Sequence, residues 1–281
     1  MKLVKLSPVL SALVLAALVL AACAGAPIPP PPPMALPSVV PGQGVDLPTD
    51  ASDVLNELKD SRVGFVARYY RDPDSHWPPL SASEARRLSS LGLKIVAVWE
   101  WHSRDPLRFS YASGYGDAIA AYSQARAVGQ PAGSAIYFAV DFNPTSQYLD
   151  PIEEYFRGIG AGLTAASGGT AAYRIGVYGS GAVCDVVKRA GLGQYCWLSN
   201  SIAWNGSAGY EDWDIRQGDR MPELSFNHDS DEAKNDFGGF QVASDGGGAS
   251  PGGAASAADV GAPPQAPLGE QSLTSAAISV R

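Results

Sequence analysis

The sequence predicts an α/β fold, a TIM-like barrel built from five βα units followed by three further strands. Five apolar, β-branched runs alternate with helical segments, a pattern typical of a parallel sheet with right-handed crossovers. Three more strand-like runs follow, with gaps too short or too rich in Gly and polar residues for crossover helices. Eight strands favour closure into a barrel. An open doubly wound sheet is the alternative, but no strand leads into a phosphate-binding glycine fingerprint.

The expected elements follow from local sequence signals. The central one is the run 135–142, which is apolar and β-branched, has turn residues on both sides and reaches an acid at Asp141. Residues 81–84 read Ser-Ala-Ser-Glu, the pattern of a capping box, and open a helix that stops at Gly92. The other strands are expected at 44–47, 63–70, 93–100, 173–179, 196–199, 213–217 and 224–229, and the helices at 49–61, 81–91, 117–128, 150–166 and 181–190.

Composition argues against several classes of function. The chain has 281 residues and a formal net charge of -8, with 20 Lys and Arg against 28 Asp and Glu. So acidic a chain offers no basic patch to neutralise phosphates, and we expect no nucleic-acid partner. The three His, at positions 76, 102 and 228, show no ligand spacing, so we expect no metal site. We expect no cofactor and a monomeric protein.

The N-terminus has the organisation of a secretory signal peptide over residues 1–22. Lys2 and Lys5 form a positive region, and the apolar stretch 9–20 is too short and too sharply ended for a membrane span. The next residues, Leu20-Ala-Ala-Cys23, resemble the lipobox of bacterial lipoproteins, in which the Cys is lipidated. We therefore expect an extracytoplasmic, membrane-anchored lipoprotein; the alternative is an ordinary signal peptide with a chance Cys.

Composition also divides the rest of the chain. Residues 23–43 are Pro-rich and predict a stiff tether. Residues 44–243 hold all of the expected strands and helices, and one barrel domain accounts for them. Residues 244–281 are rich in Gly, Ala, Ser and Pro, which predicts a disordered tail. Inside the domain, the spacing of Cys184 and Cys196 leaves a disulfide and two buried thiols as equal alternatives.

Polar and aromatic side chains lie at or near the ends of most of the expected strands. In a parallel barrel the C-terminal ends of the strands converge on one face, where barrel enzymes place their sites. Carboxylates among Tyr, Trp, Arg and Gln are typical of a sugar site, because aromatic faces stack on pyranose rings and paired carboxylates supply an acid and a nucleophile or base. The candidate catalytic residues are Asp141, Glu100 and Asp46, and the candidate substrate-binding residues are Arg68, Tyr69, Trp99, Tyr178, Trp197, Gln217 and Asp229.

Each candidate also has a structural explanation. Asp46 and Glu100 could be turn or loop residues, and Asp229 could belong to a solvated acidic loop that includes Asp231. The aromatic candidates could be core residues, and Arg68 could pair with a neighbouring acid. The two explanations differ in whether the side chains converge on one cavity.

Seven stretches carry a resemblance to known proteins: Phe65-Val-Ala-Arg-Tyr-Tyr70, Ser81-x-x-Glu-Ala85, Gly92-Leu-Lys-Ile-Val96, Gly129-Gln-Pro131, Ile136-Tyr-Phe-Ala-Val-Asp-Phe142, Arg174-Ile-Gly-Val-Tyr-Gly179 and Asp236-Phe-Gly-Gly-Phe240. In this order they resemble a bacterial domain of unknown function that is described as glycoside-hydrolase-like and is common in secreted actinobacterial proteins. More distantly, the chain is similar to lysozymes of the Chalaropsis type, which are barrels of five βα units and three further strands. The resemblance spans nearly all of residues 45–240. It implies a carboxylate-lined pocket and a role on cell-wall polysaccharide.

The chain departs from these lysozymes after the fourth strand. Their fourth strand ends Asp-x-Glu, with the Glu as the acid, and the nearer relatives usually carry Asp-Phe-Asp there. This chain has Asp141-Phe142-Asn143. Asn143 cannot exchange a proton as a carboxylic acid does. The resemblance therefore leaves Asp141 or Glu100 as the acid of a hydrolase, with Asp46 and Asp229 tuning the pair.

Two hypotheses follow. The first is a lipid-anchored glycoside hydrolase that acts on peptidoglycan or another cell-envelope glycan through a carboxylate-lined pocket. The second is a non-catalytic glycan-binding or envelope-organising lipoprotein with a degenerate hydrolase site. A suitably spaced pair of carboxylates flanking an open cleft would favour the first, and acids held in ion pairs would favour the second.

Overall fold

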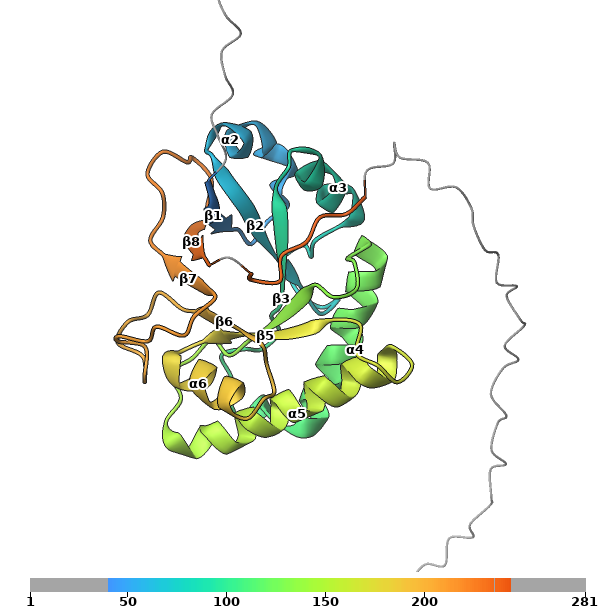
Figure 1. The fold of residues 1–281 in the computed structure, drawn as a ribbon, viewed down its shortest axis with the longest axis vertical. Helices are drawn as coiled ribbons and strands as arrows, with labels where there is room; N and C mark the ends of the chain where they lie inside the picture. Colours follow the sequence, from blue (N-terminus) through green and yellow to red (C-terminus); the bar gives the residue numbers. More distant parts are fainter. Residues whose placement is uncertain (1–39, 235, 244–281) are drawn as a thin grey trace, which may run out of the picture. The chain divides into compact units, whose positions relative to one another are not determined.

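The strands close into the predicted barrel. The computed structural model describes residues 40–234 and 236–243, and its eight strands follow one another around the barrel in sequence order (Figure 1). The predicted signal peptide, Cys23 with most of the tether, and the C-terminal tail lie outside the described residues. The strands are β1 (Val40–Asp46), β2 (Val63–Tyr70), β3 (Lys94–Trp99), β4 (Ala135–Ala139), β5 (Arg174–Gly179), β6 (Tyr195–Leu198), β7 (Ile215–Gly218) and β8 (Asp229–Ala233).

Helices connect the strands from β1 to β6, whereas loops alone connect β6, β7 and β8 (Figure 1). This asymmetry matches the predicted loss of crossover helices in the last third of the barrel. The α-helices are α2 (Leu55–Asp60), α3 (Ala82–Ser90), α4 (Tyr111–Val128), α5 (Leu149–Ala166) and α6 (Gly181–Arg189), and short 3-10 turns form η2 (Ala51–Asp53), η3 (Pro106–Arg108) and η4 (Ser146–Tyr148). None of the helices in the described ranges is long and apolar enough to cross a membrane.

Seven strands are parallel and the last is reversed. Each strand from β1 to β6 pairs in parallel with the next, whereas β8 is antiparallel to both of its neighbours, β7 and β1. The fold prediction is therefore confirmed, with closure made by a strand of opposite direction. In this register Asp46 at the end of β1 pairs with Asp229 at the start of β8. Reversal thus brings the first residue of β8 to the end of the barrel where β1 finishes.

Alternate residues along the strands face two separate apolar layers. In β2, Phe65, Ala67 and Tyr69 face the barrel interior, where they belong to an apolar cluster of strand residues and Phe237. The residues between them face the layer that the helices cover. This alternation is the ordinary two-residue period of a strand, and it decides which strand residues can reach the barrel interior.

The segment around Phe237 closes the N-terminal end of the barrel interior. Its ring lies 4.9 Å from that of Phe65, and its carbonyl accepts a 2.8 Å hydrogen bond from the hydroxyl of Tyr137. The next residue, Gly238, accepts a 2.9 Å hydrogen bond from the backbone N–H of Ala135, at the start of β4. Phe237 is therefore a plug at the end opposite to the strand tips.

The two longest helices, α4 and α5, pack through glycines. A Cβ on Gly114 would lie 1.9 Å from the carbonyl oxygen of Tyr155, and one on Gly158 would lie 2.1 Å from that of Tyr111. Neither glycine can be replaced unless the helices separate. The contact fixes the start of α4, and with it the end of the loop that follows β3.

The helix α4 begins at Tyr111, earlier than the predicted start at Asp117. Ser110 and Ser113 form a capping box in which each side chain accepts a hydrogen bond from the other's backbone N–H, at 3.0 and 3.2 Å. The Ser- and Gly-rich first turns have low helix propensity, so the sequence pattern alone placed the start too late. Capping and the contact with α5 hold this segment in the helix.

Two strands and one capping box also differ from the predictions. The strand β1 begins at Val40, so residues 40–43, assigned to the tether from their sequence, belong to the barrel. The eighth strand lies at 229–233, not at the predicted 224–229, so Asp229 begins it. This acidic segment forms a strand despite its unfavourable composition because both of its edges are paired. At the start of α3, Ser81 accepts the N–H of Glu84, but the Glu84 carboxylate turns away to Arg68.

Cys184 of α6 and Cys196 of β6 form a disulfide, with their Cα atoms 5.4 Å apart. The sequence left this pairing open. Both cysteines are fully buried, and the bond attaches α6 to the strand that carries Trp197. It therefore fixes one wall of the cavity described next.

Candidate active site

A cavity of about 280 Å³ opens at the C-terminal ends of the parallel strands. Its volume is at the lower end of the range for small-molecule sites. Of the ten predicted site residues, eight line it: Asp46, Tyr69, Glu100, Asp141, Tyr178, Trp197, Gln217 and Asp229. Its other lining residues are Val98, Arg104, Ala139, Ser199, Asn200, Ser201 and Trp204.

Arg68 and Trp99 do not line this cavity, so the expectation that they contact substrate is wrong. Arg68 is fully buried beneath the helices, where its guanidinium lies 2.5 Å from Glu84 and donates a 3.0 Å hydrogen bond to the carbonyl of Leu47. Trp99 packs in the same outer layer. The physical reason is the period of the strands, because Arg68 and Trp99 alternate with the inward-facing Tyr69 and Val98.

Asp46 lies at the centre of the polar side chains on the cavity floor. The Tyr69 hydroxyl donates to one of its oxygens at 2.8 Å, and the Gln217 amide donates to the other at 2.9 Å. The same amide reaches Asp229 at 3.4 Å, and the Gln217 oxygen accepts from the Tyr178 hydroxyl at 3.0 Å. One chain of hydrogen bonds therefore joins residues from β1, β2, β5, β7 and β8.

Burial raises the pKa of Asp46 to about 7. The hydrogen bonds from Gln217 and Tyr69 stabilise the carboxylate and oppose this shift, while the negative charges of Asp229 and Glu100 add to it. Near neutral pH the group is divided between its protonated and ionised forms. Asp46 can therefore hold or release a proton near neutral pH.

Asp231 lies inside the barrel rather than on a solvated loop. It is 3% exposed and accepts a 2.9 Å hydrogen bond from the indole N–H of Trp197. Its second oxygen has no partner within the described part of the chain. Burial, with the charge of Asp46 adding to it, raises its pKa well above the ordinary value. Burial therefore favours the neutral form of the Asp231 carboxyl group, whose hydrogen bond holds the Trp197 indole.

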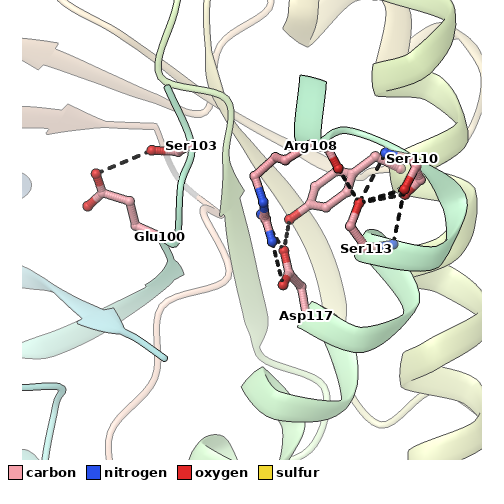
Figure 2. Close-up of polar contacts among 7 residues, drawn as sticks. Glu100, Ser103, Arg108, Ser110, Ser113 and Asp117 are labelled. Carbon is pink, nitrogen blue, oxygen red and sulfur yellow. Dashed lines mark hydrogen bonds and ion pairs between the residues drawn. The ribbon is translucent and has the colours of Figure 1, made fainter. Parts of the chain in front are cut away.

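The loop after β3 carries Glu100 and is anchored at both ends (Figure 2). At its start, the Ser103 hydroxyl donates to Glu100 at 3.4 Å. At its end, the Arg108 guanidinium makes two hydrogen bonds with the Asp117 carboxylate, at 2.7 and 2.9 Å, and the Tyr155 hydroxyl donates to the same carboxylate at 2.6 Å. Such a bidentate pair is geometrically specific, so Glu100 projects from a fixed loop.

Glu100 has surroundings that favour its protonated form. Burial raises its pKa; the nearby guanidinium of Arg71 opposes this and the negative charge of Asp141 adds to it. An Arg71 nitrogen lies 3.5 Å from the Glu100 carboxylate. Compared with an isolated Glu, Glu100 therefore keeps its proton to a higher pH.

Asp141 follows β4 and forms an ion pair with Arg104 at 2.6 Å. The Arg104 side chain is 82% exposed, so water screens this pair and the pair is weak. The backbone N–H of Asp141 donates to the carbonyl of Ser103 at 2.9 Å. Ser103 therefore contacts both the Glu100 side chain and the Asp141 backbone, and it links the two strand ends.

Asn143 is not among the residues that line the cavity. Its side-chain oxygen accepts a 2.8 Å hydrogen bond from the backbone N–H of Asn205. Asn205 belongs to the loop after β6, which brings Trp204 to the cavity. The position at which the resembling lysozymes carry their acid is thus used here to connect two loops.

Sequence reasoning missed Arg104, Asn200 and Trp204, which line the cavity from loops. A signal for them existed, since the loops that follow parallel strands lie at the same end of a barrel as the strand tips. Loop conformation decides which loop side chains turn toward the cavity. Loop conformation does not follow a simple sequence period, so these three residues could not be selected from the sequence. Within the described residues, no cluster of His, Cys, Asp and Glu has the arrangement of a metal site.

Two relatives share part of their sequence with this chain. Rv2525c of Mycobacterium tuberculosis, provisionally named a peptidoglycan hydrolase, is 33% identical over 161 residues, which is 53% of this chain and 60% of that protein. The uncharacterized protein YbfG of Bacillus subtilis is 36% identical over 123 residues, 42% of this chain and 17% of its own length. The chain thus spans between 17% and 60% of the lengths of the curated relatives it matches.

The fold has a counterpart among solved structures. The crystal structure of the Tat-secreted protein Rv2525c in complex with HEPES superposes with a TM-score of 0.60 at 23% identity, covering 71% of this chain and 99% of that one. A family profile described as Rv2525c-like, glycoside hydrolase-like domain matches residues 56–249, more than half of the sequence. This chain therefore belongs to the family of Rv2525c-like, glycoside hydrolase-like domains.

Proposed function

We propose that this protein is a glycoside hydrolase that acts on peptidoglycan or another cell-envelope glycan. The observation that carries the proposal is the meeting of Glu100 and Asp141 at one open cavity in opposite electrostatic settings. Burial raises the pKa of Glu100, whereas Asp141 carries its charge in an ion pair with Arg104. Glycoside hydrolysis uses such a pair, with one carboxyl group protonated and the other ionised.

In this mechanism Glu100 is the general acid. It donates its proton to the glycosidic oxygen as the bond to the leaving sugar breaks, and positive charge develops at the anomeric carbon. Asp141 stabilises that charge and serves as the nucleophile or as the base for water. Arg104, which is on the exposed rim, moves off Asp141 when the sugar enters. Asp46, buried below them, adjusts the proton affinity of Glu100 through its own charge.

The remaining cavity residues supply sugar-binding groups. Tyr69, Tyr178 and Trp204 offer aromatic faces, and Gln217 with Asp229 offers groups for sugar hydroxyls. Trp197 also lines the cavity and is held by Asp231. Aromatic faces and convergent polar groups of this kind bind pyranose rings. We assign substrate binding to these residues.

Two features of the relatives support a cell-envelope substrate. Rv2525c carries a provisional name as a peptidoglycan hydrolase, and its solved structure is described as that of a Tat-secreted protein. Secretion places a protein where the envelope glycan is. The low content of Lys and Arg in this chain does not fit a nucleic-acid substrate.

A second candidate function is non-catalytic glycan binding, and two observations favour it. Asn143 occupies the position of the acid in the resembling lysozymes and has become a loop brace. Both proposed catalytic acids have an arginine partner, Arg71 for Glu100 and Arg104 for Asp141. The cavity would then bind the glycan, or organise it within the envelope, without cleaving it.

Release of reducing ends from purified peptidoglycan separates the two functions. The wild type should release them, and Glu100→Gln and Asp141→Asn should each lower the rate by roughly 10²- to 10⁴-fold. Asp60→Asn is the matched control, because it removes an exposed acid from α2, and it should retain full activity. No release by the wild type, with the glycan still retained in a pull-down, would rule out the hydrolase and leave the binding protein.

We also propose that the protein is anchored to a membrane by lipid on Cys23, outside the cytoplasm, with the Pro-rich segment after it as a spacer. The support is the Leu20-Ala-Ala-Cys23 sequence behind a positive and an apolar region. Cys23→Ala should move the protein from the membrane fraction to the soluble fraction and abolish incorporation of labelled fatty acid. Unchanged fractionation and labelling would exclude the anchor.

A further inference from the structure

Arg71, the residue directly after β2, lies just behind the cavity wall. It is 7% exposed and is not itself a lining residue. Its guanidinium carbon lies 4.2 Å from the centre of the Tyr69 ring, and one of its nitrogens lies 3.5 Å from the Glu100 carboxylate. Tyr69 and Glu100 both line the cavity. Arg71 therefore contacts two cavity residues that come from different strands.

The backbone of Arg71 is held in place from outside the barrel. The side chain of Gln124, on α4, accepts from the Arg71 N–H at 3.0 Å and donates to the Arg71 carbonyl at 2.5 Å. Both main-chain polar groups of Arg71 are thus satisfied by one amide. The side chain therefore projects toward Tyr69 and Glu100 from a fixed starting point.

The burial of Arg71 is unfavourable by itself. Its Nε has no hydrogen-bond partner in the described part of the chain, and burial lowers the pKa of the guanidinium. A buried donor without a partner costs about 1–3 kcal/mol. What offsets this cost is the contact with the Tyr69 ring and the charge of Glu100, so the interactions of Arg71 are directed at the cavity.

We propose that Arg71 is a positioning residue of this site, which holds Glu100 and Tyr69 in one arrangement from behind the cavity wall. Ser103 donates to one Glu100 oxygen, and Arg71 lies 3.5 Å from the other. Stacking on Arg71 likewise fixes the ring of Tyr69, whose hydroxyl donates to Asp46 at 2.8 Å. Arg71 thus connects Glu100, which it contacts directly, with Asp46, which it reaches through Tyr69. The inference rests on the proposed role of Glu100 as the acid.

Several charged and titratable groups besides Arg71 interact with Glu100. Arg71 approaches from the end of β2, Arg104 and Ser103 from its own loop, and Asp141 from the end of β4. The other titratable groups that interact with it electrostatically are Asp46 on β1, Tyr69 on β2 and Tyr178 on β5. The two arginines therefore offer a matched comparison, because replacing either one removes one positive charge near Glu100.

The test compares Arg71→Met, Arg71→Lys and Arg104→Met in the full chain. In NMR titrations of the labelled Glu100 carboxyl carbon, Arg71→Met should raise the pH at which Glu100 titrates, and by more than Arg104→Met does. Arg71→Lys should keep Glu100 near its wild-type titration, because the charge remains. It should still loosen Tyr69, because Lys lacks the planar face that stacks on the ring.

Kinetics supply a second readout. Because a general acid must be protonated, Arg71→Met should move the alkaline limb of the kcat/KM profile to higher pH, and it should lower kcat at the optimum by roughly 10- to 100-fold through misplacement of the acid. KM should rise by a smaller factor than kcat falls, since Arg71 acts on the bound sugar only through Tyr69. A merely structural Arg71 would lower thermal stability and leave the pH limb where it is.

The proposal is overturned if Glu100 titrates no differently in Arg71→Met than in Arg104→Met, or if only stability changes. The NMR titration needs no turnover. A wild type that hydrolyses no glycan would therefore remove the proposed function while the contact between Arg71 and Glu100 is still tested. If Arg71→Met fails to fold, the test uses Arg71→Lys and the NMR line widths of the Tyr69 ring signals. The proposal expects these line widths to differ from those of the wild type. Unchanged line widths would mean that stacking on Arg71 does not hold the ring.

Discussion

Asn143 accepts a 2.8 Å hydrogen bond from the backbone N–H of Asn205. The Asn205 amide in turn donates to the carbonyl of Pro144 at 3.3 Å. The loop after β4 is thereby attached at two points to the loop that brings Trp204 to the cavity. A side chain at this position can support the cavity wall without entering the cavity, so the absence of a carboxyl group at Asn143 does not by itself leave the site without an acid.

Asn143→Asp is therefore expected to leave the rate of glycan hydrolysis unchanged. A carboxylate oxygen accepts the Asn205 N–H as the amide oxygen does, and the proposed acid is Glu100, not residue 143. Reducing-end release from peptidoglycan is the measurement, with Asn143→Ala as a comparison that removes the hydrogen bond. An inactive wild type together with an active Asn143→Asp would mean that the site is a degenerate hydrolase.

Stability should fall as pH rises from about 4 to about 7, because Asp46 has a folded-state pKa of about 7 against an ordinary value of 3.8. In that window the folded state binds a proton that the unfolded state has lost, so raising the pH favours unfolding. Asp46→Asn should reduce this fall by on the order of 3 kcal/mol, as measured by urea unfolding at several pH values. Asp60→Asn should show the wild-type dependence, and an equal slope in all three proteins would contradict the buried position of Asp46.

Removal of the disulfide should destabilise the fold. The bond between Cys184 and Cys196 closes a loop with a sequence separation of 12, and replacement of both residues by Ala should lower the free energy of unfolding by about 2–3 kcal/mol. A thiol reductant should lower the melting temperature of the wild type toward that of the double variant and leave the double variant unaffected. If reductant acts equally on both proteins, its effect does not come from this bond.

The buried pair of Arg68 and Glu84 should behave differently in single and double variants. Arg68→Met alone leaves a buried carboxylate unpaired and should cost about 3–5 kcal/mol. Arg68→Met combined with Glu84→Gln should recover part of this loss, because the introduced amide is neutral and its oxygen can still accept the N–H of Ala51, which is 2.8 Å from the Glu84 carboxylate. A double-mutant cycle measured by denaturant unfolding gives the coupling energy, and additive losses would mean that the two residues act separately.

The first seven strands and their order were predictable because period and turn chemistry are local properties of the sequence. The residues at strand tips were largely predictable for the same reason, as Asp46, Tyr69 and Gln217 illustrate. The two errors at strand ends, Arg68 and Trp99, came from treating every polar or aromatic tip residue as inward-facing. Counting the two-residue period from Tyr69 would have placed Arg68 outside the barrel.

Other features depend on contacts between distant segments and leave no local signal. The acidic segment of β8 becomes a strand only because β1 and β7 flank it. Arg71 reaches the site through a clamp from Gln124 on α4. Trp204 reaches the cavity on a loop that Asn143 braces. Each case needs the tertiary structure, since the partners are far apart in the sequence.

Phe237 and its neighbours fill the barrel at the end away from the strand tips. In the part of the chain that the structure describes, side chains fill the barrel below the cavity, so the cavity at the strand tips does not continue through the barrel. If this cavity cleaves a glycan as proposed, the cleaved sugar leaves from the same end of the barrel at which the next glycan enters. If the protein is a hydrolase, its released fragment should therefore inhibit competitively, and long glycans should be attacked where they can bend into the mouth rather than threaded through.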